Sequence, residues 1–205
     1  MILSGDNSST YGQIRPDFQR IIDMIQPSST VLDLGCGGGN LLHYLEQERN
    51  VKGQGVEVSA SGINACIKKG IDVLQGDILE GLKDYGENVF DYVILSQTLH
   101  ELSSPNKVIE EMLRVGKKAI VSFYNLAFYK YRLKFFLTGR FPRDFPYNWK
   151  NTYASIITLK DFRKYCEENG IIIEAETILD EKGKELHTKY PNWRGQIALF
   201  MLENS

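Results

Sequence analysis

The chain has 205 residues, of which 42% are hydrophobic and 24% charged, and this composition indicates a globular protein with a sizeable core. The formal net charge of −2 gives no general attraction to nucleic acid, and no apolar run is long enough to span a bilayer. The residues after Met1 do not resemble a secretion signal, and Cys36, Cys66 and Cys166 are too dispersed for a metal site or a disulfide framework. We therefore expect a cytoplasmic protein without a bound metal.

Apolar runs bounded by turn residues predict a series of β-strands. The run Phe90–Leu95 has no strong interruption, which is typical of a central strand in a parallel sheet, because such a strand is buried on both faces. The last two runs are predicted to form a closing hairpin. In chain order the predicted strands are Thr30–Leu34, Gly53–Val58, Ile71–Leu74, Phe90–Leu95, Ala119–Phe123, Ile171–Ile178 and Gln196–Leu202.

Segments with helical periodicity separate these strands. Pro16 is a favourable first helical residue, Ser59 and Thr158 are predicted N-caps, and Gly70 and Gly116 are predicted helix ends. The first predicted helix starts at Pro16 and has Phe18, Ile21, Ile22 and Ile25 on one face. The second is Asn40–Arg49, with Leu41, Leu42 and Leu45 directed inward. The others run from Ser59 to about Lys69, from Pro105 through Arg114, and over Thr158–Asn169.

Strands that alternate with helices of this length predict an α/β fold with right-handed crossovers. We expect a doubly wound, mostly parallel, seven-stranded sheet whose last strand is antiparallel. The chain is interpreted as a single domain over residues 1–205, with an insertion at 124–157 after the fifth strand.

A glycine-rich turn, Gly35-Cys36-Gly37-Gly38-Gly39, follows the first predicted strand, and Asp33 precedes it. Such a turn lets the backbone approach a ligand closely, and the following helix directs free N–H groups at it. A dinucleotide site requires G-x-G-x-x-G, whereas these glycines alternate. The run resembles the first motif of class I S-adenosylmethionine-dependent methyltransferases, although a purely structural turn is an alternative. Cys36 is interpreted as a small packing residue.

Two acids follow at the ends of the next two strands. Glu57 ends the second, where a carboxylate can accept hydrogen bonds from both ribose hydroxyls. Asp77 ends the third, and the methyltransferase resemblance implies that it receives the adenine amino group beside Ile78. The predicted site for S-adenosylmethionine or S-adenosylhomocysteine comprises Asp33, Gly35, Cys36, Gly37, Gly39, Glu57, Val58, Gly76, Asp77, Ile78, Ser96 and Gln97.

The segment from Ser96 to Glu101 follows the fourth strand and is expected to face the transferred methyl group. His100 is the candidate general base, because its ordinary pKa lies near neutrality, and Glu101 or Gln97 could orient it. The alternative places His100 at a helix start on the surface, with no catalytic role.

The predicted insertion is aromatic and basic. It contains Phe128, Phe136, Tyr147 and Trp149 among many aromatic residues, interleaved with lysines and arginines. It could be a lid over an acceptor pocket, a partner surface, a membrane-bound amphipathic helix over Leu126–Leu137, or an additional helix packed on the core.

Further motifs resemble the methionine biosynthesis protein MetW family over nearly the whole chain. They are Arg15-Pro16-Asp17, the runs Phe90–Leu99, Glu110–Gly116 and Ile120–Phe123, Leu137-Thr138-Gly139-Arg140 with Pro146-Tyr147, and Pro191-Asn192-Trp193-x-Gly195; Gly38 and His100 depart from the family's pattern.

The resemblance implies a methyltransferase fold, a link to methionine synthesis and association with homoserine O-acyltransferase. Two hypotheses follow: a small-molecule methyltransferase whose acceptor the sequence does not identify, or a non-catalytic accessory partner and activator of that acyltransferase.

Overall fold

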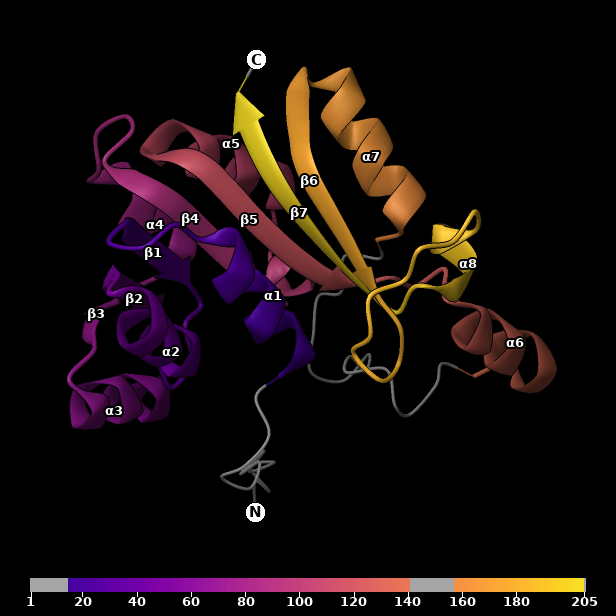
Figure 1. The fold of residues 1–205 in the computed structure, drawn as a ribbon, viewed down its shortest axis with the longest axis horizontal. Coiled ribbons are helices and arrows are strands. Elements are labelled where there is room, and N and C mark those ends of the chain that lie inside the picture. The colour runs from indigo at the N-terminus through magenta and orange to yellow at the C-terminus, as the bar shows by residue number, and fades with distance from the viewer. Residues whose placement is uncertain (1–14, 141–156, 205) are drawn as a thin grey trace.

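A computed structural model describes residues 15–140 and 157–204. Its centre is a seven-stranded sheet with the strand order β3-β2-β1-β4-β5-β7-β6 (Figure 1). The strands are β1 (Thr30–Leu34), β2 (Lys52–Glu57), β3 (Asp72–Gln75), β4 (Phe90–Ser96), β5 (Gly116–Tyr124), β6 (Ile171–Leu179) and β7 (Ile197–Asn204).

The first five strands are parallel, whereas β7 pairs antiparallel with both β5 and β6. The predicted fold class is therefore confirmed, including the central position of β4 between β1 and β5. The strand order reverses between β1 and β4. Ligands in open α/β sheets bind beyond the carboxyl ends of the strands at such a reversal.

The helices agree with the predicted ones to within a few residues, with two additions. Ser59 and Thr158 cap their helices as predicted, through Gly62 N at 3.2 Å and Asp161 N at 3.2 Å. The short α4 and α8 were not predicted. The helices are α1 (Pro16–Met24), α2 (Asn40–Arg49), α3 (Ala60–Lys69), α4 (Ile78–Lys83), α5 (Pro105–Val115), α6 (Tyr129–Thr138), α7 (Leu159–Glu168) and α8 (Pro191–Arg194), with a 3-10 turn η1 (Leu99–Glu101).

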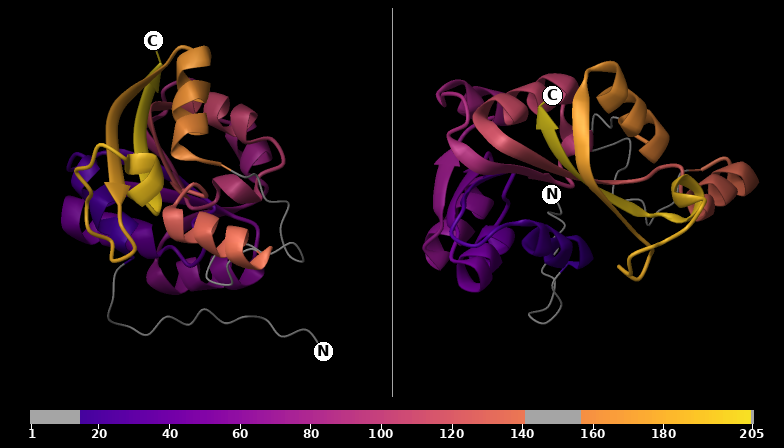
Figure 2. Two further views of the ribbon diagram at one scale, coloured as in Figure 1. Left: turned by 90° about the vertical axis from the view of Figure 1, so that its right-hand side faces the viewer. Right: turned by 45° about the horizontal axis from the view of Figure 1, so that its top comes forward.

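Helices cover both faces of the sheet and divide the core in two (Figures 1 and 2). On one face, α1, α2 and α3 pack on the sheet, with Leu41, Leu42 and Leu45 inward as predicted. On the other face, α4, α5 and α7 bury a cluster that includes Phe123 and Phe162, whose ring centroids lie 5.1 Å apart. The carboxyl ends of the strands remain uncovered by these two layers.

Helix α6 and the short α8 lie beside each other, at the end of the molecule opposite α3 (Figures 1 and 2). The rings of Tyr129 and Trp193 are 6.0 Å apart, and Gln196 donates a hydrogen bond to the Tyr131 hydroxyl at 2.6 Å. Residues 141–156 of the predicted insertion, with Tyr147 and Trp149, lie outside the described residues. None of the described helices has the length and apolar character needed to cross a membrane.

The outermost strand β6 is irregular. Its pairing with β7 shifts register between Ile173 and Ala175, which marks a β-bulge. Glu174 forms an ion pair with Lys118 at 2.6 Å, and Glu176 forms one with Arg163. Charged pairs therefore flank the bulge along this edge of the sheet.

Candidate functional site

The glycine-rich turn adopts a backbone conformation that side chains rarely accept. Gly35, Gly37 and Gly39 have φ values of 70°, 55° and 70°. A Cβ on Gly35 would lie 3.0 Å from Thr98, and one on Gly39 would lie 2.9 Å from the Cys66 sulfur. A Cβ on Gly37 would meet no protein atom within 4 Å. The protein's own packing thus explains two of these glycines, whereas Gly37 borders open space.

Glu57 holds this turn in place. One carboxylate oxygen accepts a hydrogen bond from the Gly37 N–H at 2.8 Å, and the other accepts one from the Ser59 N–H at 2.7 Å. The side chain is buried, but each carboxylate oxygen has a second lone pair that can accept from a ligand. A hydrogen bond from the turn to the Asp33 side chain is not found among the described residues, so Glu57 is the acid that orders the turn.

Helix α3 supports the back of the turn. Lys69 donates to the Gly38 carbonyl and, at 2.6 Å, to the Asn40 side chain. The Cys36 and Cys66 sulfurs are 3.8 Å apart and buried, and burial raises the pKa of both thiols. Such thiols are poor nucleophiles. Cys36 packs against Cys66 in the buried core, in keeping with its interpretation as a small packing residue.

A cavity of about 510 Å³ opens in front of the turn, at the carboxyl ends of β1, β2, β3 and β4. It brings together eight of the predicted site residues: Gly35, Glu57, Val58, Gly76, Asp77, Ile78, Ser96 and Gln97. Asp33, Cys36, Gly37 and Gly39 do not line it. Five lining residues were not predicted as binding residues, namely Arg15, Val56, Thr98, Glu101 and Leu102.

The cavity combines carboxylates with an apolar wall. Asp77 is exposed at the N-terminus of α4, where it caps the helix through the Leu79 N–H at 2.9 Å. Beside Glu57, Val58 is 72% exposed although its side chain is apolar, and Ile78 is half-buried. A planar apolar ring with a polar edge fits between such groups.

Arg15 reaches the cavity from α1 and is held there by a buried network. Its guanidinium donates to both carboxylate oxygens of Asp17, which is fully buried, and to Ser96 Oγ at 2.9 Å. Ser96 Oγ in turn donates to Asp17 at 3.1 Å, and the guanidinium lies 4.2 Å from the centre of the Phe18 ring. The only sequence signal for Arg15 is the Arg15-Pro16-Asp17 motif. Ser96, predicted to bind cofactor, thus also fixes Arg15.

Asp33 lies behind the turn, with only 3% of the residue exposed. Burial raises its pKa to about 7, although the nearby Arg15 guanidinium opposes this rise, and the carboxylates of Glu57 and Asp17 add to it. Asp33 is therefore a carboxyl group that titrates near neutrality in the folded chain.

The η1 turn places Glu101 at the cavity and His100 behind it. His100 is only 2% exposed and does not line the cavity, and its Nε2 lies 3.4 Å from Glu101 Oε1. Burial lowers the pKa of His100, whereas its contact with Glu101 opposes that fall. The predicted surface position of His100 is wrong, because Leu99 and His100 fold inward together. Its catalytic role stays a prediction.

A family model described as methionine biosynthesis protein MetW matches residues 15–202. The chain belongs to the MetW family. The resemblance that the sequence motifs indicate is thereby confirmed. Because the match begins at Arg15, it includes the residue that reaches the cavity from α1.

Two curated relatives extend the MetW comparison. The bifunctional methionine biosynthesis protein MetXA/MetW of Rhodopirellula baltica is 35% identical over 197 residues, which cover 89% of this chain and 32% of the relative. The tRNA (carboxymethyluridine(34)-5-O)-methyltransferase of Arabidopsis thaliana is 34% identical over 113 residues, covering 54% and 27% respectively. This chain thus spans about a third or less of the length of either relative.

Solved structures show that the MetW fold is that of class I methyltransferases. S-adenosylmethionine-dependent methyltransferases from Archaeoglobus fulgidus and Aquifex aeolicus superpose with TM-scores of 0.62 and 0.60, at 17% and 19% identity. The match to the Archaeoglobus fulgidus protein covers 92% of this chain and 91% of that protein, and the match to the Aquifex aeolicus protein covers 91% and 88%. The [4+2]-cyclase SpnF also superposes, with a TM-score of 0.63 at 16% identity over 90% of this chain and 80% of its own. The shared fold alone therefore does not fix a reaction.

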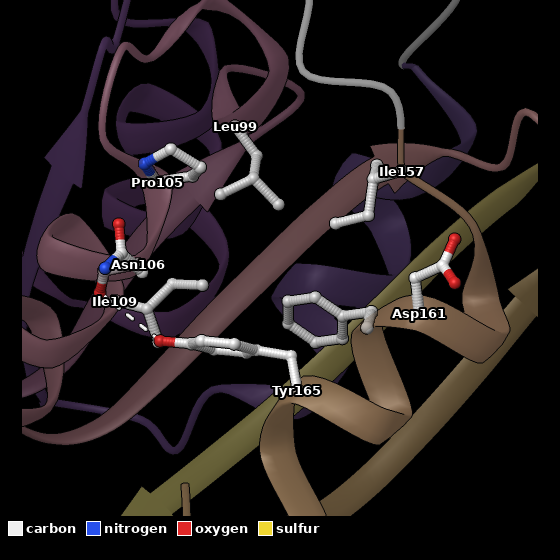
Figure 3. A pocket seen from close by; sticks show the side chains of 8 residues that line it. Leu99, Pro105, Asn106, Ile109, Ile157, Asp161 and Tyr165 are labelled. Carbon is white, nitrogen blue, oxygen red and sulfur yellow. Dashed lines mark hydrogen bonds between the residues drawn. The ribbon is translucent and has the colours of Figure 1, made fainter. Parts of the chain in front are cut away.

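A second, smaller cavity of about 240 Å³ lies between α5 and α7 (Figure 3). Its lining residues are mostly apolar. At its edge, the Tyr165 hydroxyl of α7 donates a hydrogen bond to the Asn106 carbonyl of α5 at 3.3 Å. Asp161 is its one charged lining residue. The carboxylates Glu57 and Asp77 thus belong to the larger cavity. The smaller cavity is lined by Leu99, Pro105, Asn106, Ile109, Ile157, Asp161, Phe162 and Tyr165.

Proposed function

We propose that this MetW-family protein binds S-adenosylmethionine or S-adenosylhomocysteine in the larger cavity. The observation that carries the proposal is that Glu57, Asp77 and Gly35 of the glycine-rich turn line one cavity, while Glu57 also accepts a hydrogen bond from Gly37, which borders open space. Glu57 accepts from the ribose hydroxyls, Asp77 accepts from the adenine amino group, and Val58 and Ile78 cover the ring. The methionine portion lies over the turn at Gly35 and Gly37.

Arg15 would bind the carboxylate of the methionine portion. Its guanidinium lines the cavity and is pre-oriented by the buried Asp17, and its side chain is 43% exposed. Because Nε and Nη2 are engaged by Asp17 and Ser96, the two N–H groups of Nη1 are the ones that would bind a second carboxylate.

Methyl transfer is the chemistry that bound S-adenosylmethionine would supply, through its activated sulfonium methyl group. The chain's own contribution would be alignment of an acceptor near Gln97 and Glu101, which border the cavity. Where an acceptor must lose a proton, Glu101 is the carboxylate at the cavity, and His100 stands behind it.

Isothermal titration calorimetry of the protein with S-adenosylmethionine, S-adenosylhomocysteine and NAD⁺ tests this proposal. We expect saturable one-to-one binding of the first two compounds and none of NAD⁺. Asp77→Ser keeps the helix cap but removes the carboxylate, and should weaken binding at least tenfold without unfolding α4. Absence of binding by both S-adenosyl compounds would overturn the proposal, and unchanged affinity in Asp77→Ser would overturn the adenine assignment.

A second proposed function is that of an accessory partner of homoserine O-acyltransferase. The bifunctional MetXA/MetW relative favours it, since one chain there combines both parts and 32% of it matches this protein. Acyl-homoserine formation by the acyltransferase of the same organism should be faster when this protein is added. An acyltransferase rate that does not change at a large excess of this protein would exclude the role.

A further inference from the structure

The molecule exposes an apolar surface that its own described residues do not cover. Helix α6 buries only Tyr131, while Leu133, Phe136 and Leu137 are 53%, 84% and 69% exposed. On α8, Trp193 is 49% exposed. We refer to Leu133, Phe136, Leu137 and Trp193, together with Arg132, as the α6–α8 face. None of these residues lines the larger cavity.

The energetics of α6 argue that a partner covers this face. A ten-residue helix is marginal in water unless it packs an apolar face, and this one leaves Leu133, Phe136 and Leu137 largely exposed to solvent. Exposed apolar surface concentrated on one element marks interaction sites more often than scattered single residues do. The apolar residues of α6 are thus better explained by association than by the fold.

The rest of the face has the composition of a protein interface. The Arg132 guanidinium lies 5.4 Å from the centre of the Trp193 ring, and the Tyr129 ring lies 6.0 Å from the same ring. Tryptophan, tyrosine and arginine are the residues that most often dominate binding energy. Between Leu126 and Arg140 the sequence contains no acidic residue, and although Lys130 pairs with Glu181, the face itself contains the positive Arg132, so the complementary surface should be apolar with an acidic group opposite Arg132.

We propose that the α6–α8 face is the surface on which homoserine O-acyltransferase docks, an inference that rests on the second proposed function. In the relative that joins MetXA and MetW, the matched segment corresponds to 89% of this chain and the rest of the relative is about twice as long. The covalent link in that relative favours association of the two corresponding parts, and the α6–α8 face is an exposed apolar surface that this chain offers for it.

Single substitutions on α6 test the proposal. Phe136→Asp and Leu133→Asp place a charge in the face, and neither side chain supports the fold, because both are exposed. Ile67→Asp is the matched control, since Ile67 is 63% exposed on α3, at the opposite end of the molecule (Figure 1). Each purified variant would be titrated with the acyltransferase by biolayer interferometry, with far-UV circular dichroism and S-adenosylmethionine binding recorded in parallel.

We expect each α6 variant to bind the acyltransferase at least tenfold more weakly, whereas Ile67→Asp binds like the wild type. Wild-type affinity in both α6 variants would overturn this surface and leave the accessory function intact. Failure of the wild-type protein to bind the acyltransferase would overturn both. If the α6 variants instead abolish a homodimer seen by light scattering and leave acyltransferase binding unchanged, the face belongs to a second copy and the proposal is wrong.

Discussion

Glu57 and Gly37 are joined by a 2.8 Å hydrogen bond from the backbone N–H of the glycine to the carboxylate. The residue that is proposed to bind ribose is thus also the residue that shapes the glycine turn. Binding and stability should therefore change together at this position. The carboxylate needs no large movement to receive a ligand, because its position is set by the Gly37 and Ser59 N–H groups.

Replacement of Glu57 by glutamine should lower both stability and affinity. The amide keeps one acceptor oxygen but directs its NH₂ group at one of the two N–H donors, which leaves a buried donor without an acceptor. We expect a loss of about 1–3 kcal/mol in the free energy of unfolding, and at least tenfold weaker binding of S-adenosylmethionine. Urea unfolding and calorimetry measure the two effects. The exposed Glu48, changed to glutamine, is the control and should alter neither.

Asp17→Asn should destabilise α1 and weaken binding indirectly. The buried Asp17 carboxylate receives hydrogen bonds from Arg15 and Ser96, and the amide cannot accept all of them. We expect a loss of about 1–3 kcal/mol in unfolding free energy. Asp23→Asn on the same helix should cost about 0.5 kcal/mol or less, since that carboxylate is exposed. Equal effects of the two substitutions, measured by chemical unfolding, would contradict the role of the buried network.

Stability should depend on pH through Asp33, whose pKa burial raises to about 7 from the ordinary 3.8. Between these values the unfolded chain has released the proton and the folded chain retains it, so the contribution of Asp33 to stability falls as pH rises. The fall is up to about 1.4 kcal/mol per pH unit. Asp33→Asn removes this dependence. The unfolding free energy of the variant, relative to that of the wild type, should therefore rise from pH 5 to pH 7 and level off above about pH 8. A difference that stays constant across urea titrations at these pH values would show that Asp33 is ionised throughout.

Gly37→Ala should separate ligand binding from folding. Its φ of 55° makes alanine unfavourable by about 1–2 kcal/mol, and the methyl group would occupy the open space proposed for the ligand. Gly70→Ala is the matched control, because Gly70 has a φ of 75° and equally open surroundings at the end of α3. Both variants should lose similar stability, but only Gly37→Ala should lose affinity for S-adenosylmethionine by calorimetry. Full affinity in Gly37→Ala would place the ligand elsewhere.

Gly39→Ala should be more destabilising than Gly37→Ala or Gly70→Ala. In addition to a φ of 70°, its Cβ would lie 2.9 Å from the Cys66 sulfur and 3.3 Å from Ile71. Both neighbours are buried, so the clash cannot be relieved toward solvent. Thermal unfolding of the three variants should therefore rank Gly39→Ala lowest, and a melting temperature equal to that of Gly70→Ala would show that the core there is less tightly packed.

The sequence was informative where a local pattern determines the structure. The uninterrupted run in β4 and the caps at Ser59 and Thr158 identify their elements, because strand burial and helix capping depend on neighbouring residues. Helix α4 was missed because it has only six residues and because Asp77 was interpreted only as a strand end, although it also caps that helix. Short helices have too few turns to show a period.

Residues that meet through long-range contacts were not predictable in the same way. Arg15 reaches Ser96 only because α1 packs on the sheet, and nothing near Arg15 in the sequence indicates that contact. The burial of His100 likewise depends on how the 3-10 turn folds against β5, whereas its sequence context resembles a surface helix start. The glycines and acids of the cavity were found because each ends a strand, and the topology then aligns those ends.

The bulge between Ile173 and Ala175, with its flanking ion pairs, bears on how this protein can self-associate. A regular outer strand offers unpaired backbone groups to a strand of another molecule, which promotes aggregation. In β6 the bulge interrupts that template, and Glu174 and Glu176 add charge along it. Growth of the sheet from one molecule into the next is therefore opposed on this side, so that specific association is left to side-chain surfaces rather than to backbone pairing.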